Sequence, residues 1–511
     1  MNLLTNIIFT TCFLPIYLFL RRQFFNLPLH QDTGFYVSNH TIISRKFSYR
    51  KGWNSEFAFC SKVLPEYFYS VIYLKHGGES YPFYSRFYYS IYNYLTSIFL
   101  GTISFFLSDG HPAAYCSGLV CYAFFSSQPF FGIYFESAEQ FEPLFQVISF
   151  FLLTFGFKYH QNFSIFLGLS VLIFESLFIK TSSLIAAFLI IVFFIISQSG
   201  FWLAVAGAII LIGALYVYWL FYNQKKTSFL FSSTIKHEIY WQGKPTFLKL
   251  FKQLIRKTVF LGYCLLMDFP VLLILSILGG ISMDFGTSCL VIYLLLGCVV
   301  YYVQAAKIWY FLIPLLPPLA LLGSAGIVKL INVYGTAGFI FAVLLLLAWF
   351  VYYCVRYRDA EEALNLKVWK PYGSSMAMRN FLLTKYLLKI KSVVNWQSLF
   401  VYGVCNQAYV LLDTAYSTNI ISAAPWLDCM KRDWQESLNR QLVAEPPSFI
   451  FSVDECFTID TIRNELGLNY KQVGIAETNF HLYQYFGSVE HVQPNFLSKP
   501  YQSEMLLKNR E

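Results

Sequence analysis

The chain has 511 residues, of which 57% are hydrophobic and only 13% are charged, whereas soluble domains carry about 25% charged residues. Together with a mean hydropathy of +0.51, this composition excludes a soluble globular enzyme and indicates a polytopic membrane protein. The formal net charge of +9 is spread over several polar segments, so the charge pattern does not indicate nucleic-acid binding.

Apolar runs long enough to cross a bilayer core of about 30 Å recur up to residue 355. The first, 3–20, has no basic leader and no small-residue cleavage site, so we expect an uncleaved helix. The later runs are 88–108, 112–131, 141–157, 163–179, 182–198, 200–222, 258–280, 287–305, 308–328 and 335–355. The predicted fold is a mostly α-helical membrane protein with about eleven transmembrane helices.

Two long polar segments, 21–87 and 223–257, interrupt this series. An odd number of spans places both segments and the C-terminal tail on one side of the membrane. We expect 1–355 to form the transmembrane domain, with a juxtamembrane linker at 356–391 and a small α/β domain at 392–511. In that last domain, strands are predicted at 398–403, 449–453 and 481–485, and a helix at 461–466.

The side of the membrane is ambiguous. The 21–87 segment has nine Lys or Arg residues, against two in the short turns on the opposite side. The positive-inside rule would make this face cytoplasmic, but the rule is weak for loops this long. A basic loop can also bind an anionic substrate, so the residues alone leave the orientation open.

One carboxylate stands out in the first polar segment. Asp32 follows the first span closely enough to meet a lipid head group, and a carboxylate there can accept the proton of an attacking hydroxyl. The structural alternative is a helix cap or a salt bridge with Arg21 or Arg22.

Cations near the bilayer are the second group of candidates. Lys62 and Arg86 lie in the same segment, and Lys307 with Tyr310 lies at a predicted membrane interface. Such cations can neutralise a phosphate leaving group. They can equally bind lipid head groups, and Lys307 beside Tyr310 also fits a snorkelling lysine in an aromatic belt.

Acids also occur at or within the apolar runs. Glu142 begins the fourth span, where it faces either a cavity or the positive end of the helix dipole. Glu175 is placed to pair with Lys180 at the end of the fifth span. Asp268 lies in the middle of the predicted 258–280 span, which suggests a functional group or a helix–helix contact.

The order of these motifs resembles that of the GT-C membrane glycosyltransferases, in particular the protein O-mannosyltransferases and the lipid A aminoarabinose transferases. The similar stretches are Asp32 to Tyr36, Lys62 with Pro65, Arg86, Glu142 to Phe145, Lys180 to Ser182, and Lys307 to Pro318. Two departures are Thr33, where the family often has a second acid, and the single Pro65 in place of a doubled proline.

The resemblance implies an inverting transferase with a polyprenyl-phosphate sugar as donor and a glycan, lipid or protein hydroxyl as acceptor. It implies a bacterial inner membrane enzyme whose active site faces the periplasm or exterior. Asp32 would be the general base, and Lys62, Arg86 and Lys307 would bind the lipid phosphate. Glu142 would position a substrate, and Lys180 and Tyr310 would complete the substrate-binding set. Because no His/Cys/Asp cluster has metal-ligand spacing, no obligate metal or other cofactor is expected, although the wider GT-C class includes metal-dependent members.

Two alternatives remain at this stage. A lipid-linked glycan flippase or transporter would account for Asp268 and Glu175 within spans, but not for the 21–87 loop after the first helix. An O-antigen-type ligase or polymerase normally has its large external loop late in the chain, where only the modest 223–257 segment lies.

Overall fold

The computed structural model describes most of the apolar helices and a smaller part of the tail. The described residues are 3–22, 24–25, 63–77, 80–127, 140–179, 209, 213, 247–281, 285–303, 309–356, 384, 386–391, 398–402, 407–412, 422–423, 439–440, 442–452, 467–475 and 481–488.

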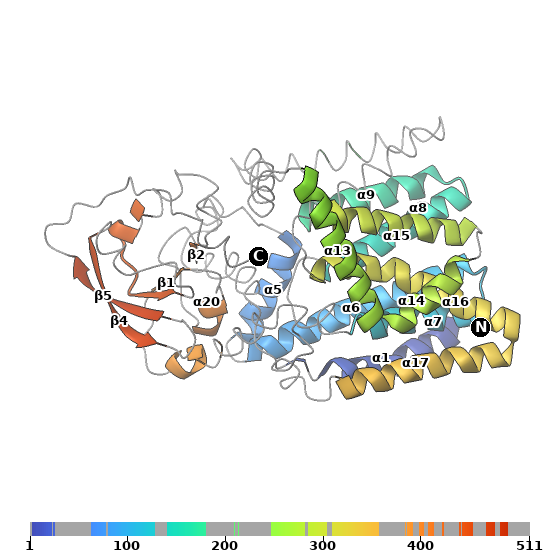
Figure 1. The fold of residues 1–511 in the computed structure, drawn as a ribbon, viewed down its shortest axis with the longest axis horizontal. Helices are drawn as coiled ribbons and strands as arrows, with labels where there is room; N and C mark the ends of the chain where they lie inside the picture. Colours follow the sequence, from blue (N-terminus) through green and yellow to red (C-terminus); the bar gives the residue numbers. More distant parts are fainter. Residues whose placement is uncertain are drawn as a thin grey trace. The chain divides into compact units, whose positions relative to one another are not determined.

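The chain divides into two compact units (Figure 1). The first comprises Met1–Leu27, Phe83–Trp219 and Pro245–Ser374, and the second comprises Pro28–Pro82, Leu220–Lys244 and Ser375–Glu511. Most of the two long polar segments therefore belongs to the same unit as the tail. The domain boundaries predicted at residues 355 and 391 stay predictions.

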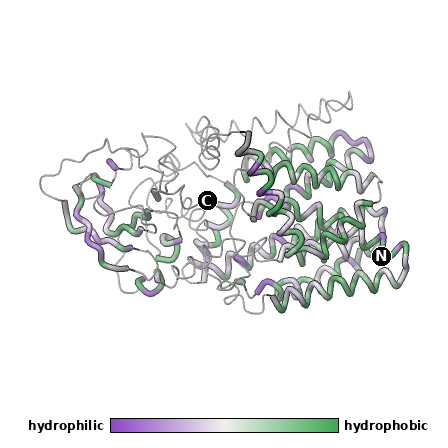
Figure 2. The backbone as a smooth tube through the Cα atoms, viewed as in Figure 1, coloured by the Kyte–Doolittle hydropathy of each residue, from purple (hydrophilic) through white to green (hydrophobic). Residues whose placement is uncertain are grey.

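The first unit is a bundle of apolar helices, which appear predominantly hydrophobic in Figure 2. Its elements are α1 (Leu3–Arg22), α6 (Tyr81–Leu107), α7 (Pro112–Phe125), α8 (Glu142–Lys158), α9 (Asn162–Phe178), α13 (Phe247–Asp268), α14 (Pro270–Gly280), α15 (Phe285–Val303), the 3₁₀-helix η7 (Trp309–Leu315), α16 (Leu316–Tyr334) and α17 (Thr336–Arg356). Within the described residues, four helices are long and apolar enough to cross a membrane, or five if α13 and α14 are counted as one bent span. The protein is thus an integral membrane protein. Each predicted span in the described residues has a helical counterpart. The predicted spans 182–198 and 200–222 lie outside the described residues.

Short turns make neighbouring helices antiparallel. Between α6 and α7, Asp109 and Gly110 both have positive φ values, and Pro112 then begins α7, where its missing N–H is tolerated. The turn between α8 and α9 comes close to this one, because Lys158 forms a 2.9 Å salt bridge with Asp109. We call the end of the bundle with these two turns the Asp109 end.

The opposite end gathers the other helix termini, and we call it the Arg21 end. Tyr92 on α6 donates a hydrogen bond to the Phe141 carbonyl just before α8, at 3.0 Å. Near the end of α17, the Tyr353 hydroxyl bonds the Leu20 carbonyl of α1 at 3.2 Å and the Ser127 carbonyl after α7 at 2.9 Å. The alternation of spans predicted this grouping of termini.

Small residues allow the central helices to approach closely. Where α14 crosses α16, a Cβ atom on Gly279 would overlap the Leu322 carbonyl oxygen, and one on Gly326 would overlap the Leu275 carbonyl oxygen. Ser324 of α16 lies 2.5 Å from the hydroxyl of Ser104 on α6 and 2.6 Å from that of Ser117 on α7. Backbone contact and buried hydroxyl bonds therefore fix the middle of the bundle.

The structure corrects three sequence-based assignments. The 21–87 segment is not wholly a loop, because it contains α5 (Val63–His76) and the start of α6, so Arg86 lies on a helix. The predicted 258–280 span is broken before Pro270, so Asp268 ends α13 instead of lying in the middle of a span. Because α13 begins at Phe247, the last part of the predicted 223–257 loop is helical as well.

In the second unit the tail forms a five-stranded mixed sheet of order β2-β1-β3-β5-β4. Its strands are β1 (Leu399–Tyr402), β2 (Ser422–Ala423), β3 (Phe449–Ser452), β4 (Leu468–Ile475) and β5 (His481–Ser488). β1 pairs in parallel with β2 and β3, and β5 pairs antiparallel with β3 and β4. The three predicted strands are confirmed as β1, β3 and β5, and β2 and β4 were missed; the predicted 461–466 helix lies outside the described residues.

A short helix and buried tyrosines support this sheet. On α20 (Gln407–Leu412), the Tyr409 hydroxyl accepts a hydrogen bond from the Val401 N–H of β1 at 2.9 Å. Tyr470 of β4 donates to the Pro447 carbonyl at 2.7 Å. Burial, and then the neighbouring Tyr485, raise the pKa of Tyr470 above its usual range, so its hydroxyl remains a donor throughout the working range of pH.

Candidate functional site

Two carboxylates meet at the Arg21 end of the bundle. Glu142 lies in the first turn of α8 and Glu175 in the last turn of the antiparallel α9, and both side chains are 0% exposed. Gln146 lies one turn after Glu142, on the same side of α8. Its amide nitrogen donates to Glu142 Oε2 at 3.3 Å and to Glu175 Oε1 at 3.4 Å. Gln146 therefore bridges the two acids.

The start of α8 is fixed by tyrosines of α6. The Tyr92 hydroxyl donates to the Phe141 carbonyl at 3.0 Å, and the Tyr89 hydroxyl donates to the Gln140 carbonyl at 3.4 Å. The Tyr92 and Phe141 rings lie 5.0 Å apart. Because these contacts immediately precede Glu142, they determine where its carboxylate enters the bundle.

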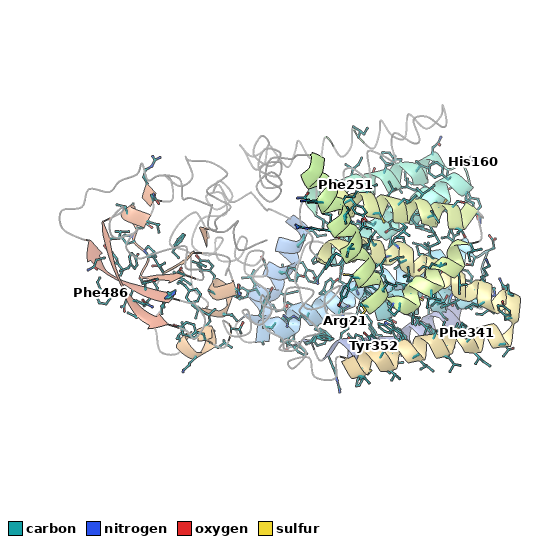
Figure 3. The ribbon with its side chains drawn as sticks, in the orientation of Figure 1. Arg21, His160, Phe251, Phe341, Tyr352 and Phe486 are labelled. Atoms are coloured by element: carbon teal, nitrogen blue, oxygen red, sulfur yellow. The ribbon has the colours of Figure 1, made fainter. Side chains whose placement is uncertain are left out.

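A buried cation lies close to this group. Arg21, in the last turn of α1, is 0% exposed and lies among the helices (Figure 3). Its guanidinium donates to the Tyr17 hydroxyl and lies 5.1 Å from the centroid of that ring and 5.3 Å from that of Tyr89. Two aromatic faces thus stabilise a charge that is expensive to bury. Tyr89 joins Arg21 to the segment before Glu142.

An asparagine on α6 extends the polar group toward α7. Asn93 Nδ2 donates to the Tyr17 hydroxyl at 2.9 Å and to Ser126 Oγ at 2.7 Å, and its Oδ1 accepts from the Tyr122 hydroxyl at 3.0 Å. The amide uses both its donor and its acceptor in these three bonds. This network holds Tyr17, and through it Arg21, in one position.

Arg86, a predicted phosphate-binding residue, is buried on α6. Its Nη1 donates to the carbonyls of Phe24 and Phe25, at 3.0 and 3.2 Å. These carbonyls follow the end of α1, so Arg86 fixes the chain just after it leaves that helix. A role in binding phosphate stays a prediction.

The buried charges share one location. Within the described part of the chain, every charged side chain classed as buried belongs to the Arg21 end: Arg21, Arg86, Glu142, Glu175 and Lys257. The Asp109 end has a salt bridge in which Asp109 is 86% exposed. Opposite charges in a region of low dielectric can bind and orient an ionic head group much more strongly than they can in water.

Several predicted residues lie outside the described residues: Asp32, Lys62, Lys180 and Lys307. Of Tyr310, in η7, only the backbone is described. Arg86 and Glu142 are therefore the predicted site residues that can be placed in full, and both lie at the Arg21 end. No group of three or more His, Cys, Asp or Glu side chains within the described ranges is arranged to hold a metal ion.

Sequence reasoning missed part of this site. Arg21 was assigned to the polar segment, yet it lies in the last turn of α1 and is buried. The sequence feature that could have indicated this is Tyr17, an aromatic residue one helical turn earlier, which accepts a hydrogen bond from Arg21. Gln146 could have been identified in a similar way, because it lies four residues after Glu142 and therefore on the same side of the helix. Glu175 was expected to pair with Lys180, and the structure shows a hydrogen bond from Gln146.

No family model and no curated protein matches the sequence. Several solved structures are similar in fold, and three of them are described below. ArnT from Cupriavidus metallidurans in the apo state has a TM-score of 0.55 at 10% identity, over 93% of this chain and 97% of that one. The same protein bound to undecaprenyl phosphate has a TM-score of 0.55 at 11% identity, over 96% and 99%.

The third is the Archaeoglobus fulgidus oligosaccharyltransferase tethered to an acceptor peptide with the NVT sequon. It has a TM-score of 0.51 at 11% identity, over 96% of this chain and 75% of that one. ArnT, a lipid A aminoarabinose transferase, and this oligosaccharyltransferase are both GT-C glycosyltransferases. The chain therefore has the fold of the GT-C membrane glycosyltransferases.

Proposed function

We propose that this protein is an inverting glycosyltransferase that moves a sugar from a polyprenyl-phosphate-linked donor to a hydroxyl of a glycan, lipid or protein. One observation carries the proposal. The buried charges lie at one end of a bundle whose fold resembles, over 96% of the chain, that of ArnT bound to undecaprenyl phosphate. A lipid phosphate at the membrane surface is the kind of group such a charged centre can bind.

In the proposed reaction, the Asp32 carboxylate takes the proton of the acceptor hydroxyl, and the oxygen attacks the sugar's C1 from the face opposite the phosphate. The bond between C1 and the phosphate oxygen breaks, and its electron pair leaves with the lipid phosphate. Lys62, Arg86 and Lys307 would stabilise that negative charge. Because phosphate is a good leaving group, the proposed reaction needs no general acid.

The remaining site residues would position the substrates. Glu142, bridged to Glu175 by Gln146, would orient hydroxyls of the sugar or the acceptor from the Arg21 end. Lys180 and Tyr310 would complete the substrate-binding set. We place this end of the bundle at the periplasmic or exterior face of a bacterial inner membrane, because polyprenyl-linked donors are used there in the group that the sequence resembles.

A flippase is less well supported by the arrangement of charges. Moving a glycan across the membrane requires polar groups along the whole path. Glu175 lies in the last turn of α9 and Asp268 ends α13, so neither occupies the middle of a described helix. The charged groups favour chemistry at one surface over passage through the bundle.

Substitution of the proposed base tests the function. Asp32→Asn should abolish transfer from a polyprenyl-phosphate sugar while leaving donor binding intact, since the amide cannot accept the acceptor's proton. Asp109→Asn is the control, because it removes an exposed carboxylate at the other end of the bundle. Turnover of Asp32→Asn close to that of this control would rule out the general-base role. Mass spectrometry of lipids and glycans from cells with and without the gene would identify the sugar and acceptor.

A further inference from the structure

Helix α13 crosses the bundle instead of running along it. Near its middle, the Thr258 hydroxyl lies 2.9 Å from that of Tyr302, at the end of α15. Near its C-terminus, the Met267 carbonyl accepts a hydrogen bond from Tyr352, in the last two turns of α17, at 3.3 Å. Both α15 and α17 end at the Arg21 end of the bundle. Because positions far apart on α13 contact the same end, the helix lies transverse to its neighbours (Figure 1).

The junction with α14 agrees with this orientation. The axis turns by 101° between Phe251–Met267 and Pro270–Gly280, and Pro270 begins the second helix. The α14 helix packs along the central helix α16, where Ser276 donates to the Leu319 carbonyl at 2.8 Å. If α14 enters the membrane with the bundle, then α13 lies close to the membrane plane.

The faces of α13 have distinct chemistry. One face packs on the protein through Lys257, Phe260 and Cys264, and the Lys257 ammonium donates to the Tyr302 carbonyl at 3.0 Å. At 100° per residue, the opposite face presents a set of exposed apolar side chains. They are Phe251, Leu254, Ile255, Val259 and Leu266.

A basic strip runs beside the apolar face. Lys252 and Arg256, one turn apart, are both exposed, and neither has an acidic partner within the described ranges. Helices that lie in the bilayer surface combine an apolar face with flanking Lys and Arg in this way. Each such cation attracts the phosphates of anionic lipids.

We propose that α13 lies in the plane of the membrane surface at the Arg21 end, with its apolar face among the acyl chains and with Lys252 and Arg256 bound to the phosphates of anionic phospholipids. This surface would anchor the Arg21 end at the level of the lipid head groups. The proposal concerns bulk membrane lipid and does not depend on the transferase activity.

Depth measurements test the orientation. In the full-length protein in nanodiscs, spin labels attached through a clickable non-natural amino acid replace Ile255 or Leu266, eleven residues apart on the apolar face. A transverse helix gives the two labels immersion depths within about 5 Å of each other. A spanning helix separates them by about 16 Å, because the rise is about 1.5 Å per residue.

The matched control is α17, where Phe341 and Tyr352 are also exposed and eleven residues apart (Figure 3). Labels there should differ in depth by about 16 Å, because the rise is again about 1.5 Å per residue. The orientation is overturned if the α13 pair shows a depth difference like that of the α17 pair.

Lipid preference tests the basic strip. A fluorophore at Val259 is quenched by brominated phosphatidylglycerol or brominated phosphatidylcholine in matched nanodiscs. Brominated phosphatidylglycerol should quench the fluorophore more strongly than brominated phosphatidylcholine does. Each cation lost should lower the local enrichment of phosphatidylglycerol about fivefold. Lys252→Gln with Arg256→Gln should therefore remove the excess, whereas Lys252→Arg should keep it.

A fluorophore at Val351 on α17 gives the reference, and its quenching should not respond to the double substitution. Depth measurements on the Lys252→Gln, Arg256→Gln protein verify that α13 has kept its position. Equal quenching by the two lipids in the wild type, or an excess that survives the double substitution, overturns the head-group assignment.

Discussion

Glu142 and Glu175, on neighbouring antiparallel helices, accept hydrogen bonds from the same side-chain nitrogen of Gln146. Two buried carboxylates so close together repel each other when both are ionised. A shared donor offsets part of that repulsion and fixes the distance between the helix ends. The chemistry of Glu142 therefore depends on a residue that has no charge of its own.

Gln146→Leu should destabilise the protein, because it removes the shared donor from two buried acceptors. Lost hydrogen bonds to buried groups typically cost about 1–3 kcal/mol. Thermal unfolding in detergent, followed by tryptophan fluorescence, measures the loss. Ser176→Ala is the control, since that hydroxyl bonds only the Leu172 carbonyl of its own helix among its described contacts. Equal stability of the two variants would contradict the bridging role.

Arg86→Gln should also destabilise the fold, by about 1.5–3 kcal/mol, because the Phe24 and Phe25 carbonyls lose a charged donor. Arg86→Lys keeps the charge and should fall between the wild type and Arg86→Gln. A donor titration separates the two proposed roles. If Arg86 also binds the lipid phosphate, Arg86→Lys should raise the donor KM, which a loss of folded protein alone would not change. An unchanged donor KM would leave Arg86 as a structural residue.

The α14–α16 crossing offers a matched pair of neighbouring glycines. Gly279→Ala would press its methyl group onto the Leu322 carbonyl, so we expect a loss of about 1–3 kcal/mol from overpacking. Gly280→Ala places the same methyl group where no atom lies within 4 Å, and it should be neutral or slightly stabilising. Thermal unfolding of both variants checks the crossing, and a stable Gly279→Ala protein would disprove it.

Lys307→Ala tests the donor side of the proposed reaction. A cation that binds the lipid phosphate contributes to donor binding and to departure of the phosphate, so its removal should raise the donor KM and lower kcat. The acceptor KM should change little. Separate titrations of donor and acceptor distinguish this from a general loss of folded protein, which would lower kcat alone.

Most of the helical arrangement could be predicted from hydropathy, since crossing a bilayer requires long apolar segments. The alternation of spans also predicted the turns around Asp109 and Lys158 and the grouping of the helix ends. The break before Pro270 was missed because 258–280 is apolar except for Asp268, so its hydropathy is that of one continuous span. Proline terminates α13 there, and hydropathy does not respond to that backbone effect.

The site was predictable only in part. Glu142 was identified because an acid at the start of an apolar span is unusual. Arg21 and Gln146 were not, because their importance depends on partners from other helices, namely Tyr89 and Glu175. In the tail, β4 was missed because Lys471, Gln472 and Gly474 interrupt its apolar pattern, and pairing with β5 compensates for them.

The Ser324 hydroxyl, which joins α6, α7 and α16, has a consequence for biosynthesis. It is translated 220 residues after Ser104 and 207 residues after Ser117. During insertion, the early helix pair must wait in the lipid without its third partner until most of the polypeptide has left the ribosome. Nascent chains that stall before residue 324 therefore leave the Ser104 and Ser117 hydroxyls without their partner on α16.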